Sequence, residues 1–124
     1  MSKSLLEKGR AAYAYKQVSV YFNSKPEKQQ KEYRSYLKKL PAMIQMNGLG
    51  QTFAFYSSQG GTYQDIYNQI SLWLGERYEE SFFDKGAVEA IISMNSGDYR
   101  MMTVEVMALS NWMRRFADGL IRKG

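Results

Sequence analysis

Short turn sequences punctuate this chain, and between them the apolar residues repeat at the spacing of an α-helix. One stripe of a helix holds Ala11, Tyr15, Val18 and Phe22, and another begins with Tyr33 and Leu37. The alternation of β-branched residues that is typical of strands is missing, and good helix formers such as Ala, Leu, Met, Lys, Glu and Gln dominate. The pattern therefore predicts an all-α fold.

Turn sequences at residues 23–26, 47–48, 59–61 and 95–98 set the boundaries of the predicted helices. In a chain of 124 residues a second core would leave each half too small to bury enough surface, so we expect one helical domain over residues 1–124. We predict a single-domain bundle of five to six helices. The predicted helices span residues 2 or 4 to 23, 27–40, 49–58, 62–75, 87–94 and 96 or 98 to 120, with a short apolar segment at 42–46.

Several helix boundaries carry specific expectations. Pro41 lacks an amide donor and its ring clashes with the preceding turn, so either a helix kinks there or a new helix starts. The helix at 49–58 is apolar on all sides and should be buried. We expect these side chains to act as caps: Ser24 for the helix at 27, Thr62 with Asp65 for the helix at 62, and Asp98 or Ser96 for the last helix.

The chain contains neither cysteine nor histidine. The absence of Cys excludes disulfides, thiolate nucleophiles and zinc–thiolate sites, and it is consistent with a reducing cytosol. Hydrolases and nucleases usually employ His as the group that titrates near neutral pH, so its absence argues against an enzyme. No apolar run approaches the roughly 20 residues that span a bilayer. We therefore expect a cytoplasmic, non-catalytic protein that needs no cofactor and contacts no membrane.

Without Cys and His, carboxylates are the remaining side chains that could bind a metal ion or form a catalytic centre. The acids in segment 76–85 have no metal-ligand spacing, so we expect solvated side chains there rather than a metal site. Glu105 falls on the predicted inner side of the last helix, and a buried carboxylate must be paired. Arg10 or Arg115 is its expected partner, and the pair would be structural.

The glycine-rich stretch 47–51 has two interpretations. A G-x-G pattern can hold phosphate at the start of a helix, but the known phosphate-binding patterns need a preceding strand and further glycines or a lysine. A tight turn between helices is therefore the preferred interpretation. Phosphate binding by the backbone amides of residues 49–51 is the alternative.

Aromatic side chains make up 15% of the chain, and bases of single-stranded RNA stack on such rings. For most of these residues a position in the core is the preferred interpretation, and five have the spacing of core positions: Trp73, Trp112, Phe53, Phe55 and Phe116. Base stacking stays open but unassigned for the tyrosines that we expect to be partly exposed, namely Tyr21, Tyr33, Tyr36 and Tyr99.

Charge is distributed unevenly along the sequence. Residues 1–39 carry a net charge of +7, residues 40–64 carry none, residues 65–98 carry −5 and residues 99–124 carry +3, which gives +5 in total. Such a dipolar chain suits a basic surface for nucleic acid and an acidic surface for a protein neighbour. A scattered, solvated surface is the alternative.

Two groups of cations could form the basic surface, one on the second predicted helix and one at the end of the last. If the bundle brings the two groups together, a groove of six to eight cations results. Such a groove would bind RNA through its phosphates, with steep salt dependence and no base specificity. The cations are Lys31, Arg34, Lys38, Lys39, Arg114, Arg115, Arg122 and Lys123.

Residues 40–55, which read LPAMIQMNGLGQTFAF, closely resemble the signature of the small α-helical subunit of type III-B CRISPR effector (Cmr) complexes. Further matching pieces follow in the right order over nearly the whole chain. They are residues 10–15 with Val18, then Tyr33, Ser35, Leu37 and Lys38, then Trp73 with Leu74, and last Tyr99 and Arg100 followed by Glu105, Leu109, Trp112 and residues 114–117. Segment 76–85 matches the family least.

The resemblance implies a non-catalytic, RNA-binding subunit that acts in antiviral defence. In that family several copies stack beside a filament of the backbone subunit that cuts target RNA, and crRNA and target RNA lie between them. The signature would serve folding or, alternatively, subunit stacking; we favour folding. The family's basic character carries over to Lys38, Arg114 and Arg115, and is suggested for Arg10, Lys31, Arg34, Lys39 and Arg122.

Without the family resemblance, the residues are also compatible with two other functions. A protein-interaction module without a direct RNA role would use the dipolar charge for head-to-tail stacking. A metal-dependent nuclease would use Glu79, Glu80 and Asp84.

Overall fold

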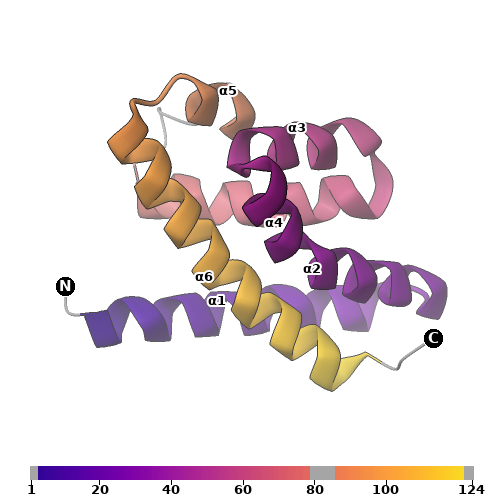
Figure 1. Cartoon of the computed structure of the whole chain (residues 1–124). Helices are drawn as coiled ribbons and strands as arrows, with labels where there is room; N and C mark the ends of the chain where they lie inside the picture. The colour runs from indigo at the N-terminus through magenta and orange to yellow at the C-terminus, as the bar shows by residue number, and fades with distance from the viewer. Residues whose placement is uncertain (1–2, 79–85, 122–124) are drawn as a thin grey trace.

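The computed structural model describes residues 3–78 and 86–121, and helices account for most of them (Figure 1). The predicted all-α bundle of five to six helices is confirmed, because these two ranges hold six helices and no strand. The helices are α1 (Lys3–Ser24), α2 (Glu27–Asn47), α3 (Leu49–Gln59), α4 (Gly61–Arg77), α5 (Ala87–Ile92) and α6 (Ser96–Leu120).

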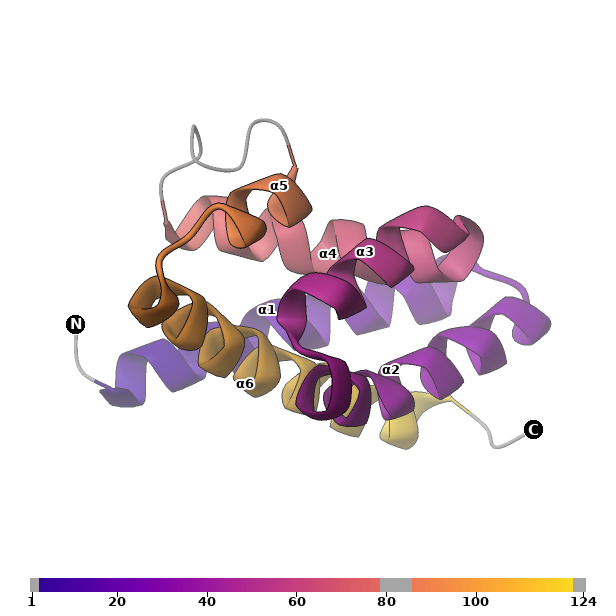
Figure 2. The ribbon, with the colours of Figure 1, turned by 45° about the horizontal axis from the view of Figure 1, so that its top comes forward.

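The helices pack in two layers, which Figure 2 shows most clearly. In one layer α6 packs against both α1 and α2, and in the other α3 packs against α4 and α5. α2 and α6 run in roughly opposite directions (Figures 1 and 2). The C-terminal half of α6 therefore lies beside the N-terminal half of α2.

The core between the layers is apolar, and every helix contributes to it. Val18 of α1, Leu37 of α2, Leu74 of α4 and Leu109 of α6 are all completely buried. Burying side chains of this size stabilises the fold by about 1.5–3 kcal/mol each. The stripe predicted for α2 faces this core, whereas the stripe predicted for α1 is correct at Val18 but wrong at Tyr15, which is 52% exposed. Ala14 and Tyr21 are buried on α1 instead, because α6 and α4 cover that side of the helix.

Two tyrosines that we expected to be partly exposed belong to the core. Tyr33 is 0% exposed and Tyr21 is 5% exposed, and their rings stack with centroids 3.9 Å apart. The prediction is wrong because both hydroxyl groups find polar partners inside the protein, which removes the cost of burying them. Tyr33 donates a hydrogen bond to Gln69 Oε1 (2.8 Å), and Tyr21 donates one to Asp65 Oδ2 (2.8 Å).

The other aromatic predictions are closer to the structure. Tyr36 and Tyr99 are partly exposed, as expected. The side chains with core spacing divide into two groups: Trp73 and Phe53 are buried, whereas Phe55, Trp112 and Phe116 are half-buried and pack against the core from outside.

Pro41 lies inside α2, so no new helix starts there. Leu40 and Ile44, on either side of it, are both buried in the core. Burial of these two side chains outweighs the single intrahelical hydrogen bond that proline cannot donate.

The predicted caps of α2 and α4 are wrong. α2 begins after Pro26 without a side-chain cap, and the Ser24 hydroxyl instead donates to the backbone of Tyr21 in α1 (3.5 Å). α4 begins one residue earlier than predicted, after Gly60, whose φ of 72° is readily available only to glycine. In both places the turn backbone itself begins the helix.

Two further predicted caps differ from the structure, at Thr62 and at the start of α6. Thr62 is buried and donates to Glu32 Oε1 (3.3 Å), so its hydroxyl serves tertiary packing rather than capping. α6 is capped by Asn95, whose side chain accepts a hydrogen bond from the Asp98 amide (2.8 Å). Neither of the predicted caps, Asp98 or Ser96, has this role, since Asn is as good a cap as either.

The interior helix α3 is buried on one face only. Leu49, Phe53 and Tyr56 are buried, whereas Gln51 and Ala54 are exposed. The prediction of burial on all sides is wrong because α2, α4 and α5 cover only part of its circumference. α4 also extends past the predicted end at residue 75 to Arg77, and α5 ends at Ile92, two residues before the predicted end.

Gly48, between α2 and α3, should be the glycine least tolerant of substitution. Its φ is 88°, and an added Cβ would lie 3.1 Å from the Tyr99 hydroxyl. Gly48→Ala should therefore destabilise the protein by about 1–3 kcal/mol, measured by urea unfolding. Gly75→Ala is the matched control, because Gly75 lies within α4 with nothing within 4 Å of an added Cβ, and it should leave stability unchanged or raise it. Equal midpoints for the two variants would contradict the role of Gly48.

Candidate nucleic-acid interface

An ion pair joins α2 to α6 where the predicted basic residues meet. Arg34 Nε lies 3.1 Å from Asp118 Oδ1, in a geometry that is ionic rather than that of a hydrogen bond. Residues four positions apart lie on the same side of a helix, one turn away. Because the two helices run in opposite directions, Lys38 and Arg114 both lie one turn from this pair, toward the same side. Two of the predicted cations from distant parts of the chain are thus brought to one seam.

The side chains along this seam differ in exposure. Lys38 and Arg115 are exposed, whereas Arg34 and Arg114 are half-buried, and the Arg114 Nε is buried without a hydrogen-bond partner among the described residues. Lys31 lies at the far end of the seam, where it lines a cavity together with Leu120 and Ile121. We call this set the α2–α6 basic surface: Lys31, Arg34, Lys38, Arg114 and Arg115.

Two of these cations already have an acidic neighbour. Lys31 Nζ lies 3.4 Å from Glu27 Oε1, and Arg34 contacts Asp118 as described. An exposed pair such as Lys31–Glu27 is worth less than about 1 kcal/mol and exchanges readily for another anion. Lys38 and Arg115 carry the most accessible charge of the surface.

Lys39 points away from the basic surface toward an aromatic cluster. Its ammonium lies 5.0 Å from the Tyr36 ring centroid and 4.7 Å from that of Tyr63, and it donates a hydrogen bond to the Tyr63 hydroxyl. The two rings stack on each other with centroids 3.8 Å apart. Lys39 therefore stabilises the contact between α2 and α4 through a cation–π interaction.

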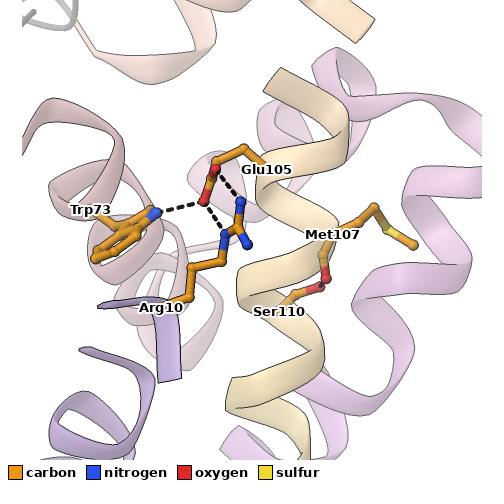
Figure 3. Close-up of polar contacts among 5 residues, drawn as sticks. All are labelled: Arg10, Trp73, Glu105, Met107 and Ser110. Atoms are coloured by element: carbon orange, nitrogen blue, oxygen red, sulfur yellow. Dashed lines mark hydrogen bonds and ion pairs between the residues drawn. The ribbon is translucent and has the colours of Figure 1, made fainter. Parts of the chain in front are cut away.

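Arg10 lies between helices, away from the basic surface (Figure 3). Its guanidinium donates to both carboxylate oxygens of Glu105, from Nε (2.8 Å) and from Nη2 (2.9 Å). Trp73 donates a further hydrogen bond from Nε1 to the same carboxylate (2.9 Å). Arg10 is thus the partner of Glu105 and Arg115 is not, which resolves the two alternatives left by the sequence.

Electrostatics hold Glu105 in its charged form. Burial alone raises its pKa, but hydrogen bonds from Arg10 and Trp73 and the positive charges of Arg10 and Arg77 outweigh this effect. The pKa of Glu105 therefore lies below its ordinary value of 4.5. On the opposite side of α6, the Ser110 hydroxyl donates to the backbone carbonyl of Met107 (3.0 Å), so this buried polar group is satisfied within its own helix.

The glycine-rich turn between α2 and α3 is closed by a tyrosine. The Gly50 amide donates to the Tyr99 hydroxyl (2.9 Å), and the Thr52 hydroxyl donates back to the Gly48 carbonyl (2.8 Å). The amide of Gly50 is therefore engaged within the fold. This favours the tight-turn interpretation over phosphate binding.

Several sequence predictions fall outside the described residues. Glu79, Glu80 and Asp84, the proposed nuclease acids, lie there, as do Arg122 and Lys123. Among the side chains that the structure describes, in residues 9–78 and 86–121, no three acidic ones lie where they could hold a metal ion. No helix within residues 3–78 and 86–121 is long and apolar enough to cross a membrane.

Two contacts of the site were missed at the level of sequence. The Trp73 indole completes the Glu105 network, and the need of a buried indole N–H for an acceptor is the signal that points to it. The pairing of Asp118 with Arg34 was also missed. Asp118 is an acid within the basic end of α6, one turn from Arg114, which marks it as a candidate partner for a cation on another helix.

The fold and this surface define a class of protein: a small helical bundle with cations along the contact between two of its helices. The family model for CRISPR-associated protein (Cas_Cmr5) matches residues 6–120. The chain belongs to this family, and the resemblance to the small subunit of type III-B CRISPR (Cmr) complexes is confirmed.

Two relatives from Thermus thermophilus agree with this assignment. "CRISPR system Cmr subunit Cmr5" is 30% identical over 93 residues, which cover 74% of this chain and 77% of the relative. The X-ray crystal structure of a CRISPR-associated Cmr5 family protein from the same organism is similar to this fold, with a TM-score of 0.79 and 29% sequence identity. That similarity covers 94% of this chain and 98% of the crystallised one.

Glu105→Gln should destabilise the protein by roughly 3 kcal/mol, because it removes the buried carboxylate to which both Arg10 and Trp73 donate. Urea unfolding near neutral pH measures this loss. Glu89→Gln is the control, since it removes one negative charge from an exposed position on α5. A loss no larger than that of the control would contradict a stabilising role for the network.

The same variant should change the pH dependence of stability. Because the folded-state pKa of Glu105 is depressed, its ion pair stabilises the fold fully above the ordinary pKa of 4.5 and loses that effect as pH falls toward the folded-state value. The stability difference between the parent and Glu105→Gln should therefore narrow as pH falls below about 4.5. Unfolding midpoints measured from neutral to acidic pH test this, and a constant difference would argue against a charged Glu105.

Proposed function

We propose that this chain is a non-catalytic, RNA-binding structural subunit of a type III-B CRISPR interference complex, and that target RNA lies along the α2–α6 basic surface. The observation that carries the proposal is the meeting of Lys38 and Arg114 at one seam, one turn from the Arg34–Asp118 contact. Arg115, exposed on the next position of α6, extends the seam outward.

The chemistry of this surface suits an RNA backbone. Each Lys or Arg that neutralises a phosphate releases a counterion, which gives affinity without reading sequence. A subunit that holds a strand whose sequence is already read by a guide needs this kind of contact. The absence of His and Cys from the chain is in keeping with cleavage by a neighbouring subunit.

Membership of the family supports a set of partners for this chain. A relative is described as a Cmr subunit, which supports a place in a multi-subunit assembly. We propose that crRNA, target RNA, the backbone RNA-cutting subunit and further copies of this chain are its partners, in the cytoplasm. The acidic middle of the sequence and its basic ends would favour stacking of copies.

Three of the cations that the family resemblance suggested are left out of this surface: Arg122 lies outside the described residues, and the other two have contacts within the fold. Arg10 donates to buried Glu105, and Lys39 packs over the rings of Tyr36 and Tyr63. Moving either guanidinium or ammonium onto RNA would break a contact between helices. We therefore assign RNA binding to Lys38, Arg114 and Arg115 first, with Lys31 and Arg34 beside them.

A protein-interaction module is the second candidate, and exposed apolar residues favour it. Ile92, Met101 and Val104 are 65%, 61% and 63% exposed, respectively, on α5 and the first half of α6. Exposed apolar side chains of this kind can mark a surface for another protein. This surface lies toward the opposite end of α6 from Arg114 and Arg115, so the two candidates can be separated by mutation.

Reversing the charges of Lys38, Arg114 and Arg115 to Glu should weaken binding of single-stranded RNA and make the remaining binding less dependent on salt. The loss of three phosphate contacts should reduce the slope of log Kd against log salt by about 2, because each contact to a single strand contributes roughly 0.7. Fluorescence anisotropy with a labelled RNA at several salt concentrations measures both effects.

The matched control reverses Lys16, Lys28 and Arg100, three exposed cations outside the basic surface, and so makes the same change in net charge. If both triple variants lose affinity equally, binding follows net charge and the surface assignment is wrong. If neither loses affinity but Val104→Ser with Ile92→Ser prevents co-purification with other subunits, the protein-interaction module is favoured.

A further inference from the structure

The outer side of α6 carries a shallow pocket beside the basic surface. Its volume is about 320 Å³, and its lining residues are Ala108, Asn111, Trp112 and Arg115. These positions are three and four residues apart, so they form one face of the helix. The contacts of Glu105 with α1 and of Asp118 with α2 fix the two flanks of α6, and this face lies between them, toward solvent.

Aromatic rings form one wall of the pocket and continue from it toward α1. The rings of Trp112 and Phe116 stack with centroids 5.6 Å apart at 23°. Phe116 in turn meets Tyr15 of α1 edge to face, with centroids 5.2 Å apart, and Tyr15 is 52% exposed. These contacts position the indole of Trp112 at the edge of the pocket.

The polar lining gives this pocket a different chemistry from an apolar docking groove. The Asn111 amide carries both donors and an acceptor, which suit the edge of a nucleobase, and the Arg115 guanidinium suits a phosphate. No acidic side chain lines the pocket among the described residues. An aromatic ring, an amide and a cation in one pocket combine the contacts that proteins use to hold one nucleotide of a single strand.

We propose that this pocket holds one unpaired nucleobase of the RNA that lies along the α2–α6 basic surface. The proposal rests on the proposed function, because Arg115 belongs to both places: it contacts the backbone while the base packs against Trp112 and pairs with Asn111. Either kind of base fits this chemistry, since stacking needs only a ring and the amide can donate or accept. The pocket adds affinity for a base without adding sequence preference.

Neighbouring charge favours RNA over a protein side chain as the occupant. Arg114 is adjacent to Arg115 in the sequence, and Lys38 of α2 lies on the same seam as Arg114. A strand with a phosphate at each nucleotide meets these cations on either side of the pocket. An apolar protein side chain would bring no group to match them.

The experiment compares a short uridine oligoribonucleotide with an oligomer of the same length in which abasic riboses replace uridine. Both carry the same phosphates, so the ratio of their Kd values reports contacts to the bases alone. For the parent chain, the uridine oligomer should bind about tenfold more tightly. Ala108→Leu fills the pocket with a good helix former and should bring the ratio close to one, with unchanged affinity for the abasic oligomer.

Val104→Leu is the matched control, since it lies one turn earlier on the same face and outside the pocket lining, and it should keep the parent's ratio. Trp112→Leu gives an independent measurement. Uridine should quench the tryptophan emission of the parent and leave that of this variant unchanged, because the remaining Trp73 is buried. If this variant is unstable, the Ala108→Leu ratio decides.

The outcomes separate this proposal from the proposed function. Equal affinity of the parent for both oligomers would overturn the base pocket and leave the basic surface standing. Binding of neither oligomer would overturn both. An Ala108→Leu variant that keeps the tenfold ratio but no longer associates with other copies or subunits would assign the pocket to a protein partner and overturn the proposal.

Discussion

The buried ion pair between Arg10 and Glu105 is the contact on which the arrangement of the helices depends. It joins α1 to α6, and the indole of Trp73 adds α4 to the same carboxylate. A charge removed from water must be matched in both charge and hydrogen bonds, so these helices have one favourable register rather than several. Apolar contacts tolerate small shifts, so this network determines how α6 is rotated on the bundle.

The rotation of α6 about its own axis determines which of its side chains face α1, α2 or solvent. With Glu105 directed to α1, Asp118 and Arg114 face α2, and Arg115 and Asn111 face outward. A helix rotated by one residue, about 100°, would bury Arg115 or separate Arg114 from the cations of α2. The contacts of Glu105 and the α2–α6 basic surface therefore lie on different sides of α6. By fixing the rotation of α6, the contacts of Glu105 position the basic surface.

Apolar spacing and turn residues along the sequence were enough to predict the helices. Predictions failed where a contact with another helix outweighs the preference of the local sequence. Apolar spacing predicted the helices and the core side of α2, because apolar residues repeat along the sequence with the period of a helix. It placed Tyr15 of α1 on the core side, although that side chain is exposed. It did not predict that α2 continues through Pro41, that Tyr33 is fully buried or that Thr62 bonds Glu32 instead of capping. Each of these depends on a partner from another helix, which spacing along one segment does not reveal.

The candidate site shows the same limit more sharply. The distribution of charge along the sequence identified the cations. It did not distinguish cations with contacts inside the protein from cations that remain available to a partner. Arg10 and Lys39 are as basic in the sequence as Lys38 and Arg115, yet the first two contact Glu105 and two tyrosine rings. What separates them is the neighbour that folding brings: a buried carboxylate or an aromatic face engages a cation inside the protein, whereas a position on the outer side of α2 or α6 leaves it to solvent. The cations available to a binding partner are therefore those on the outer sides of α2 and α6, such as Lys38 and Arg115, which are exposed.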